Sequence, residues 1–240
     1  NAFTNDMLRG LVAALDECDE REDVRAVILT GAGRGFCSGG DVSGMGEVSD
    51  NRPHVTKNRI WSGIQAFPKR AARFEKPLIA AVNGPAIGLG CDLACLADMR
   101  IASERAKFGV TFLKLGIIPG DGGTWILPRI IGEARAAELF FTGDVIDAAT
   151  AQEWGLVSRV VADADVDADV AATAGRIAAG APLVNRWHKK FIRRVVSRAR
   201  EPRPLTAEEA AEGYACFDTE DFHEGVRAFL AKETPRFEGR

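Results

Sequence analysis

Apolar positions in the first part of the chain alternate between helical spacing and short continuous runs. Residues 4–20 repeat apolar side chains at intervals of three and four, which predicts an amphipathic helix with Thr4 as its N-cap. Residues 24–30 and 78–82 are continuous β-branched and apolar runs, which predict buried strands. Helical spacing returns at about 60–74. The pattern therefore predicts alternating helices and strands over this region.

The second part of the chain changes from this alternation to helices alone. Short apolar runs predict strands at 99–102, 107–109 and 157–161, with helices at about 135–141 and 148–154. From about residue 165 the spacing is helical to the end, apart from a proline-bearing stretch at 201–204. We therefore predict an α/β core over residues 1–180 and a C-terminal helical region over 181–240.

Composition narrows the classes of protein to consider. The 240 residues are 46% apolar and 27% charged, with a net charge of −3, which suits a globular domain and argues against a dedicated nucleic-acid binder. Five cysteines without a CxxC pair indicate reduced thiols and a cytoplasmic protein, and the three histidines lack metal-ligand spacing, so we expect no metal site. The apolar stretch 78–97 is interrupted by polar residues, glycines and a proline, so we expect no membrane span.

Glycine-rich segments first suggest a nucleotide site, but their spacing is wrong for one. Residues 31–35 follow a predicted strand, yet the full GxGxxG pattern fails because Phe36 stands at a required position. No GxxxxGK[ST] loop occurs either. We therefore expect no nucleotide cofactor.

Three other segments combine small residues with carboxylates. They are residues 36–42, residues 81–94, where a strand passes through a glycine turn into a helix, and residues 115–124, which carry Asp121. Small residues let the backbone approach a ligand, and unpaired N–H groups at a helix start can bind a carbonyl oxygen. Each segment taken alone is better explained as an ordinary turn, since glycines mark tight turns far more often than active sites, and Asp121 could simply cap the next helix.

The order of these segments resembles the enoyl-CoA hydratase/isomerase (crotonase) family across nearly the whole chain. The matching motifs are Phe36 to Asp41, Ala80 to Asp92, Ala97 to Ser103, Phe108 to Arg129, Thr142 to Val157 and Glu224 to Lys232. The resemblance implies a spiral core of ββα units and C-terminal helices that assemble a homotrimer or hexamer. It also implies an acyl-CoA thioester ligand, whose coenzyme A is part of the substrate, and about one more strand before Asn1.

The resemblance also implies roles for particular residues. The N–H groups of Gly40 and Leu89 would form an oxyanion hole. Asp92 replaces the first catalytic glutamate typical of a hydratase, whereas Phe112 replaces the second, so Asp121 becomes the other candidate catalytic carboxylate. Further substrate-binding candidates are Phe36, Ser38, Asp41, Val42, Phe112, Pro119, Gly120, Trp125, Phe229 and Lys232. Of these, Ser38 and Asp41 would lie along the coenzyme A arm, and Phe229 and Lys232 would reach the adenine of a neighbouring subunit.

The favoured activity is a lyase that hydrates a 2-enoyl-CoA to a 3-hydroxyacyl-CoA through a stabilised thioester enolate. One alternative is a double-bond isomerase, which can work with a single carboxylate, and another is a non-catalytic acyl-CoA-binding module. Enolate formation needs a base near the reacting carbon, and an apolar pocket near Phe112 and Trp125 would raise the pKa of an aspartate towards that use.

Overall fold

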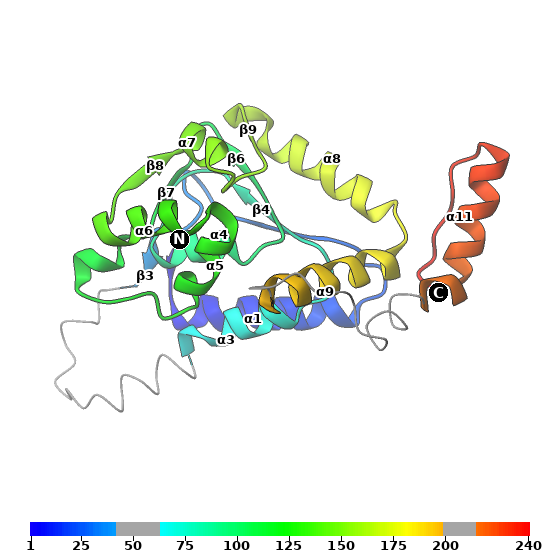
Figure 1. Ribbon diagram of the computed structural model, residues 1–240, viewed down its shortest axis with the longest axis horizontal. Helices are drawn as coiled ribbons and strands as arrows, with labels where there is room; N and C mark the ends of the chain where they lie inside the picture. The colour runs from blue at the N-terminus through cyan, green and yellow to red at the C-terminus, as the bar shows by residue number, and fades with distance from the viewer. Residues whose placement is uncertain (42–62, 199–214) are drawn as a thin grey trace.

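A four-stranded parallel sheet forms the centre of the protein. The structure is a computed structural model, and it describes residues 1–41, 63–198 and 215–240 (Figure 1). The sheet has the strand order β2-β4-β6-β9. Its strands are β2 (Val27–Thr30), β4 (Leu78–Val82), β6 (Met99–Ser103) and β9 (Arg159–Val161). Because every pairing is parallel, helices must connect the strands and cover the faces.

Two smaller sheets lie at the end of the core where the chain leaves β4. In one, β1 (Ala2–Phe3) pairs in parallel with β3 (Gly39–Gly40). In the other, β7 (Lys107–Gly109) pairs in parallel with β5 (Ala86–Ile87) and antiparallel with β8 (Val145–Asp147). These short strands position the loops that carry the candidate site.

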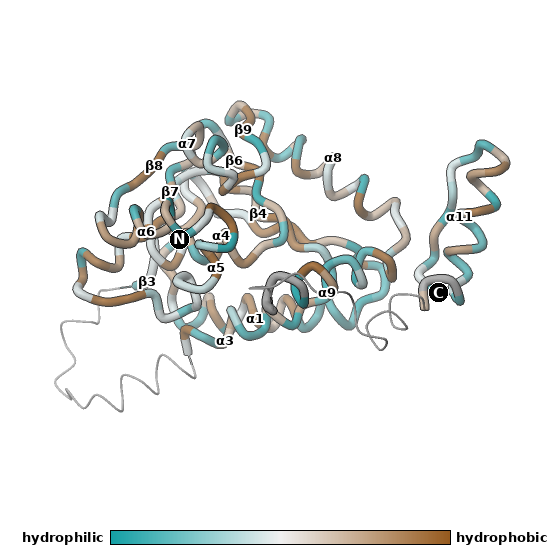
Figure 2. Tube along the Cα trace, viewed as in Figure 1, coloured by the Kyte–Doolittle hydropathy of each residue, from teal (hydrophilic) through white to brown (hydrophobic). Residues whose placement is uncertain are grey.

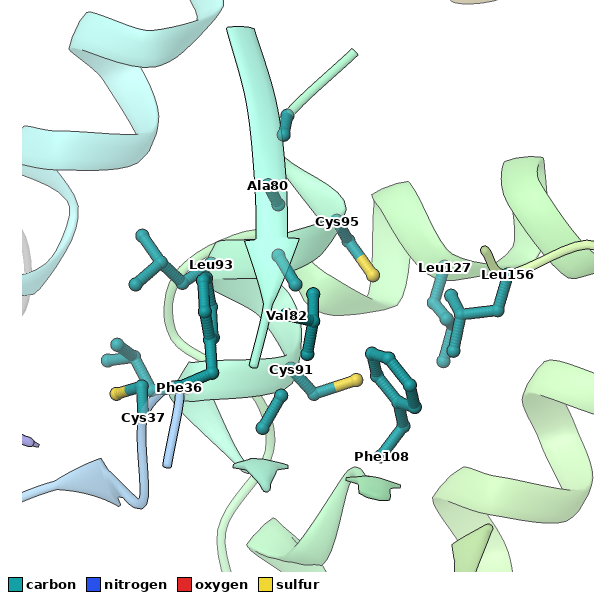
Figure 3. Close-up of a cluster of buried hydrophobic side chains, with 14 of the residues drawn as sticks. Phe36, Cys37, Ala80, Val82, Cys91, Leu93, Cys95, Phe108, Leu127 and Leu156 are labelled. Carbon is teal, nitrogen blue, oxygen red and sulfur yellow. The ribbon is translucent and has the colours of Figure 1, made fainter. Parts of the chain in front are cut away.

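Helices bury both faces of the central sheet. On one face α8 (Val166–Ala178) packs across β4 and β6, and its Val166 and Val170 form a buried cluster with Ile79 and Ile101. On the other face a larger core includes side chains from β4, α4 (Leu89–Cys95), β7 and α5 (Gly123–Ile131) (Figure 3). Burial on both faces explains why β4 is a continuous apolar run rather than an alternating one.

The remaining helices surround this core. Helix α1 (Asn5–Glu20) begins at the predicted cap, because the Thr4 side chain accepts a hydrogen bond from the Met7 N–H. It packs against α3 (Ala66–Arg73), where Arg70 forms ion pairs with Asp16 and Asp19. The other elements between β7 and α8 are η2 (Thr111–Leu115), α6 (Glu133–Thr142), α7 (Ala148–Glu153) and η3 (Asp163–Asp165).

Two C-terminal helices differ in how they meet the core. In α9 (Pro182–Arg198), the buried Lys189 ammonium lies 2.7 Å from Asp98, which fastens this helix to the core. After η4 (Ala215–Asp218), helix α11 (Glu220–Ala231) stands apart from the sheet (Figure 1). Apolar and polar residues alternate along α11 (Figure 2), and Phe229 is 83% exposed. Among the described helices, none combines the length and hydrophobicity needed to cross a bilayer.

The predicted α/β class is confirmed, whereas several boundaries were wrong. Strand β2 begins at Val27 rather than residue 24, and β9 begins at Arg159 rather than residue 157. Strand β8 was not predicted; its residues are exposed or half-buried, and its extended conformation depends on pairing with β7. The proposed division at residue 180 and the trimer role of the helices stay predictions. The proline-bearing stretch 201–204 lies outside the described ranges, as do residues 60–62 of the helix predicted at about 60–74.

Candidate active site

The first glycine-rich loop is held directly against the start of α4. Cys37 bridges Ala86, and its carbonyl accepts a 2.9 Å hydrogen bond from the Ile87 N–H. Gly90 makes this contact possible, because a Cβ at Gly90 would overlap the Cys37 carbonyl oxygen and lie 2.8 Å from the Cys37 Cβ. Strand β3, which ends at Gly40, therefore packs beside α4, which begins at Leu89.

The N–H of Leu89 is available as a donor. Leu89 is the first residue of α4 and therefore has no intrahelical acceptor. The neighbouring Gly88 N–H donates to the Gly109 carbonyl at 2.7 Å, and the Asp92 N–H donates to the Gly88 carbonyl at 3.2 Å. Within the described part of the chain, the Leu89 N–H has no such acceptor. The loop and helix thus bring Gly40 and Leu89, the two predicted oxyanion-hole residues, to the same region.

The carboxyls of Asp92 and Asp121 form a buried, interacting pair. Asp92 lies on α4 and has no solvent exposure, and Asp121 in the loop before α5 is 3% exposed. Among the described residues, no donor reaches either Asp92 oxygen or the Asp121 Oδ1. Burial, followed by the negative charge of Asp121, holds the pKa of Asp92 well above its usual value, and burial also raises the pKa of Asp121.

Gly123 supplies the space that the Asp92 carboxyl occupies. A Cβ built on Gly123 would lie 2.5 Å from both Cγ and Oδ1 of Asp92. Since real Cβ atoms do not approach other atoms so closely, the carboxyl fits only because position 123 has no side chain. Gly123 is also the first residue of α5, so the Asp92 carboxyl lies against the start of that helix.

Buried apolar and thiol side chains lie on the same helix as Asp92. Cys91 and Cys95 are buried in the same cluster as Phe108 and Leu127 (Figure 3). The Cys95 thiol contributes to the raised pKa of Asp92. The direction of this shift agrees with the prediction for Asp92. The Trp125 side chain is 51% exposed, stacks on Arg129 and lines a groove with residues of α9, and its place near the substrate stays a prediction.

The other predicted substrate-binding residues are scattered around this pair. Phe36 is a core residue with 3% exposure, so its contacts in this structure are internal. Ser38 and Asp41 are exposed on the first loop. Phe112 in η2 is half-buried, as are Pro119 and Gly120 in the third segment. The Gly120 carbonyl accepts a 2.9 Å hydrogen bond from the Gln65 side chain. Val42 lies outside the described residues.

Phe229 and Lys232 are not brought to the pair within one chain. Phe229 lies on α11, and Lys232 is the C-cap of that helix, with a φ of 58°. Helix α11 stands away from α4 and α5 (Figure 1). A contact between these residues and a ligand of another subunit stays a prediction.

Sequence reasoning missed Gly123 as a functional position. The signal was present, because two consecutive glycines follow Asp121. The first, Gly122, has a φ of 99°, and the second must lack a Cβ for the Asp92 carboxyl to fit. Only the spatial approach of α4 to α5 reveals that second requirement. Among residues 1–41, 63–198 and 215–240, no three His, Cys, Asp or Glu side chains gather as a metal site.

Comparison with known proteins gives the family. The model of the enoyl-CoA hydratase/isomerase family matches residues 1–240. A 1,2-epoxyphenylacetyl-CoA isomerase of Escherichia coli is 36% identical, and a 2,3-dehydroadipyl-CoA hydratase of the same organism is 37% identical. Each alignment covers 100% of this chain and 91% of the relative.

Solved structures agree with the sequence relatives. The crystal structure of an enoyl-CoA hydratase/carnithine racemase from Magnetospirillum magneticum superposes with a TM-score of 0.90 at 37% identity, covering 100% of this chain and 88% of that one. An enoyl-CoA hydratase from Bacillus anthracis gives 0.88 at 34% identity, covering 100% and 91%. The predicted crotonase-like fold is thereby confirmed, and the chain belongs to the enoyl-CoA hydratase/isomerase family.

Proposed function

We propose that the protein hydrates a 2-enoyl-CoA to a 3-hydroxyacyl-CoA, with Asp92 and Asp121 as the acid–base pair. The observation that carries this proposal is the buried, interacting carboxyl pair near the available Leu89 N–H. Hydration needs one group to deprotonate water and another to protonate Cα, and two carboxyls with raised pKa values meet both needs. Relatives named as hydratases support the same activity.

The N–H groups of Gly40 and Leu89 would bind the thioester oxygen during this reaction. When water attacks Cβ, electrons move through the conjugated system and negative charge collects on that oxygen. Donors fixed in advance stabilise this charge without reorganisation, and each is typically worth ~3 kcal/mol of transition-state stabilisation. A side chain is not required for this role, so leucine at position 89 serves as well as glycine.

The coenzyme A arm would run over the first loop. Ser38, just before β3, and Asp41, just after it, are both exposed. In a homotrimer or hexamer, α11 of a second subunit would complete the adenine site with Phe229 and Lys232. The exposure of Phe229 fits a residue whose contacts come from another chain.

Double-bond isomerisation is a second candidate, and one observation favours it. Asp121 contributes to the raised pKa of Asp92, and neither Asp92 oxygen is open to solvent in this structure. A pair that exchanges a proton internally suits removal of a proton at one carbon and its return at another. The relative named 1,2-epoxyphenylacetyl-CoA isomerase keeps this alternative open.

The two candidates are separated by the absorbance of the conjugated thioester. Purified protein would be incubated separately with crotonyl-CoA and with a 3-enoyl-CoA, alongside Asp92→Asn and Asp121→Asn variants. A hydratase consumes the crotonyl-CoA signal, and both substitutions should abolish that loss. Absorbance that only rises, and only from the 3-enoyl-CoA, would replace hydration with isomerisation. Silence with both substrates while coenzyme A esters still bind would refute both activities on these substrates.

A further inference from the structure

The two carboxyls of the pair have unequal surroundings. Asp92 is completely buried, both of its oxygens lack a donor among the described residues, and its carboxyl lies against Gly123. Asp121 retains slight exposure. Of its two carboxyl oxygens, Oδ1 alone is buried without a hydrogen-bond donor among the described residues. A negative charge on Asp92 would therefore be fully buried with no hydrogen-bond donor among the described residues.

Asp121 is less completely enclosed than Asp92, because it retains 3% exposure. The start of α5 does not distinguish the two residues, since the Asp92 carboxyl lies against Gly123, the first residue of that helix, and Asp121 is only two residues before it. Burial raises the pKa of Asp121, whereas the neighbouring Asp92 carboxyl and the N–H groups of residues 121 and 123 act in the opposite direction. Nothing comparable lowers the pKa of Asp92.

Two adjoining buried carboxyls share one proton, because two neighbouring negative charges in a desolvated site are too costly. We propose that in the resting protein Asp92 holds this proton while Asp121 is ionised, and that Gly123 is the positioning residue that maintains the difference. The proton's location follows from the unequal surroundings alone. The catalytic roles that follow from it rest on the proposed function.

Those roles give a balanced hydration step. Ionised Asp121 takes a proton from water as the water oxygen bonds to Cβ, and the C=C electron pair moves towards the thioester oxygen as an enolate. The O–H bond of Asp92 then breaks as its proton bonds to Cα, and the enolate electrons form that C–H bond. One water has been added. Asp121 now carries the proton, which returns to the adjoining Asp92 and restores the resting state.

Infrared spectroscopy of the full-length protein without substrate tests where the proton lies. The C=O stretch of a protonated, buried carboxylic acid is distinct from the carboxylate bands and shifts on exchange into heavy water. At neutral pH we expect this band in the wild type, its retention in Asp121→Asn, and its absence in Asp92→Asn. Absence from the wild type, or retention in Asp92→Asn with loss in Asp121→Asn, would overturn the proposal.

The outcome is separable from that of the proposed function. The infrared band is measured without substrate or turnover, so a protein that fails to hydrate crotonyl-CoA could still show the proton on Asp92. Conversely, an active hydratase that carries its proton on Asp121 would keep the proposed function and refute the division of roles.

A substitution at Gly123 tests the positioning role. In Gly123→Ala the new methyl group must displace the Asp92 carboxyl, because it would lie 2.5 Å from Cγ and Oδ1. A displacement of about 1 Å typically costs ~10²-fold in rate, so we expect kcat to fall by about that factor with a smaller change in KM. The pH–rate profile should also shift, because the surroundings of Asp92 change.

Gly175→Ala is the matched control. Gly175 lies within α8, and a Cβ there would have nothing within 4 Å. This variant should keep the wild-type kcat and pH profile, and circular dichroism would establish that both variants are folded. A folded Gly123→Ala variant with the wild-type kcat and pH profile would refute the positioning role.

Discussion

Replacing Leu89 with proline removes one proposed oxyanion donor while leaving the helix intact. Leu89 is the first residue of α4, where proline is well tolerated because that N–H has no helical acceptor. The preceding Gly88 has φ 57° and ψ −123°, close to the mirror image of the extended conformation that a residue before proline requires. Glycine adopts this mirror-image conformation without steric cost. Leu89→Pro therefore deletes a single N–H without breaking a backbone hydrogen bond.

The matched control is Leu89→Ala, which retains the N–H. Both variants lose the Leu89 side chain, which is 6% exposed, so both should lose about 2–5 kcal/mol of stability. Only the proline variant loses the donor, which is typically worth about 2.7–4 kcal/mol of transition-state stabilisation. The kcat of Leu89→Pro should therefore be about 10²–10³ lower than that of Leu89→Ala.

The assay is the loss of conjugated thioester absorbance from crotonyl-CoA at saturating substrate, below the unfolding temperature of both variants. Folding of each variant would be checked by circular dichroism. Equal kcat values for the proline and alanine variants would show that the Leu89 N–H does not stabilise the transition state.

Three further predictions follow from buried contacts. Gly90→Ala should destabilise the fold by about 1–3 kcal/mol, because its methyl group overlaps the Cys37 carbonyl; an unchanged midpoint in urea would contradict that packing. Asp98→Ala should lower the free energy of unfolding by about 3 kcal/mol in the same measurement, because it removes the carboxylate that pairs with the buried Lys189. Burial lowers the pKa of Lys189 to about 8. Wild-type stability of the variant would refute this. Asp92→Asn should raise Tm at pH 8 more than at pH 4. Burial raises the pKa of Asp92 in the folded protein above its ordinary value of 3.8. Between the unfolded and folded pKa values the folded state holds a proton that the unfolded state has lost, so wild-type stability falls as the pH rises through this range. A gain in Tm that does not depend on pH would contradict the raised pKa.

The elements that the sequence predicted best are those whose pattern depends only on residues next to one another in the chain. Strand β4 was predicted with its observed bounds, because a strand buried on both faces leaves a continuous apolar run. The start of α1 was predicted from Thr4, whose capping depends only on residues three positions away. Strand β8 was missed because its three residues are extended only through pairing with β7, a distant segment.

The candidate site was predictable in its carboxylates but not in their environment. Asp92 and Asp121 were identified through the family resemblance, and the structure brings them together. Sequence spacing did not reveal that the Trp125 side chain is half exposed and stacks on Arg129, so its expected place near the pair stays a prediction. Gly123 was missed because its importance depends on the approach of two helices, which no local pattern encodes.

The central claim is that Asp92 and Asp121 transfer protons at the α-carbon of an acyl-CoA enolate. Its most direct test is mass spectrometry of an acyl-CoA ester incubated with the protein in heavy water. The account predicts that the wild type incorporates deuterium at the α-carbon, and that Asp92→Asn and Asp121→Asn both abolish it. A wild-type protein that binds the ester without incorporating deuterium, or variants that exchange as fast as the wild type, would contradict the account.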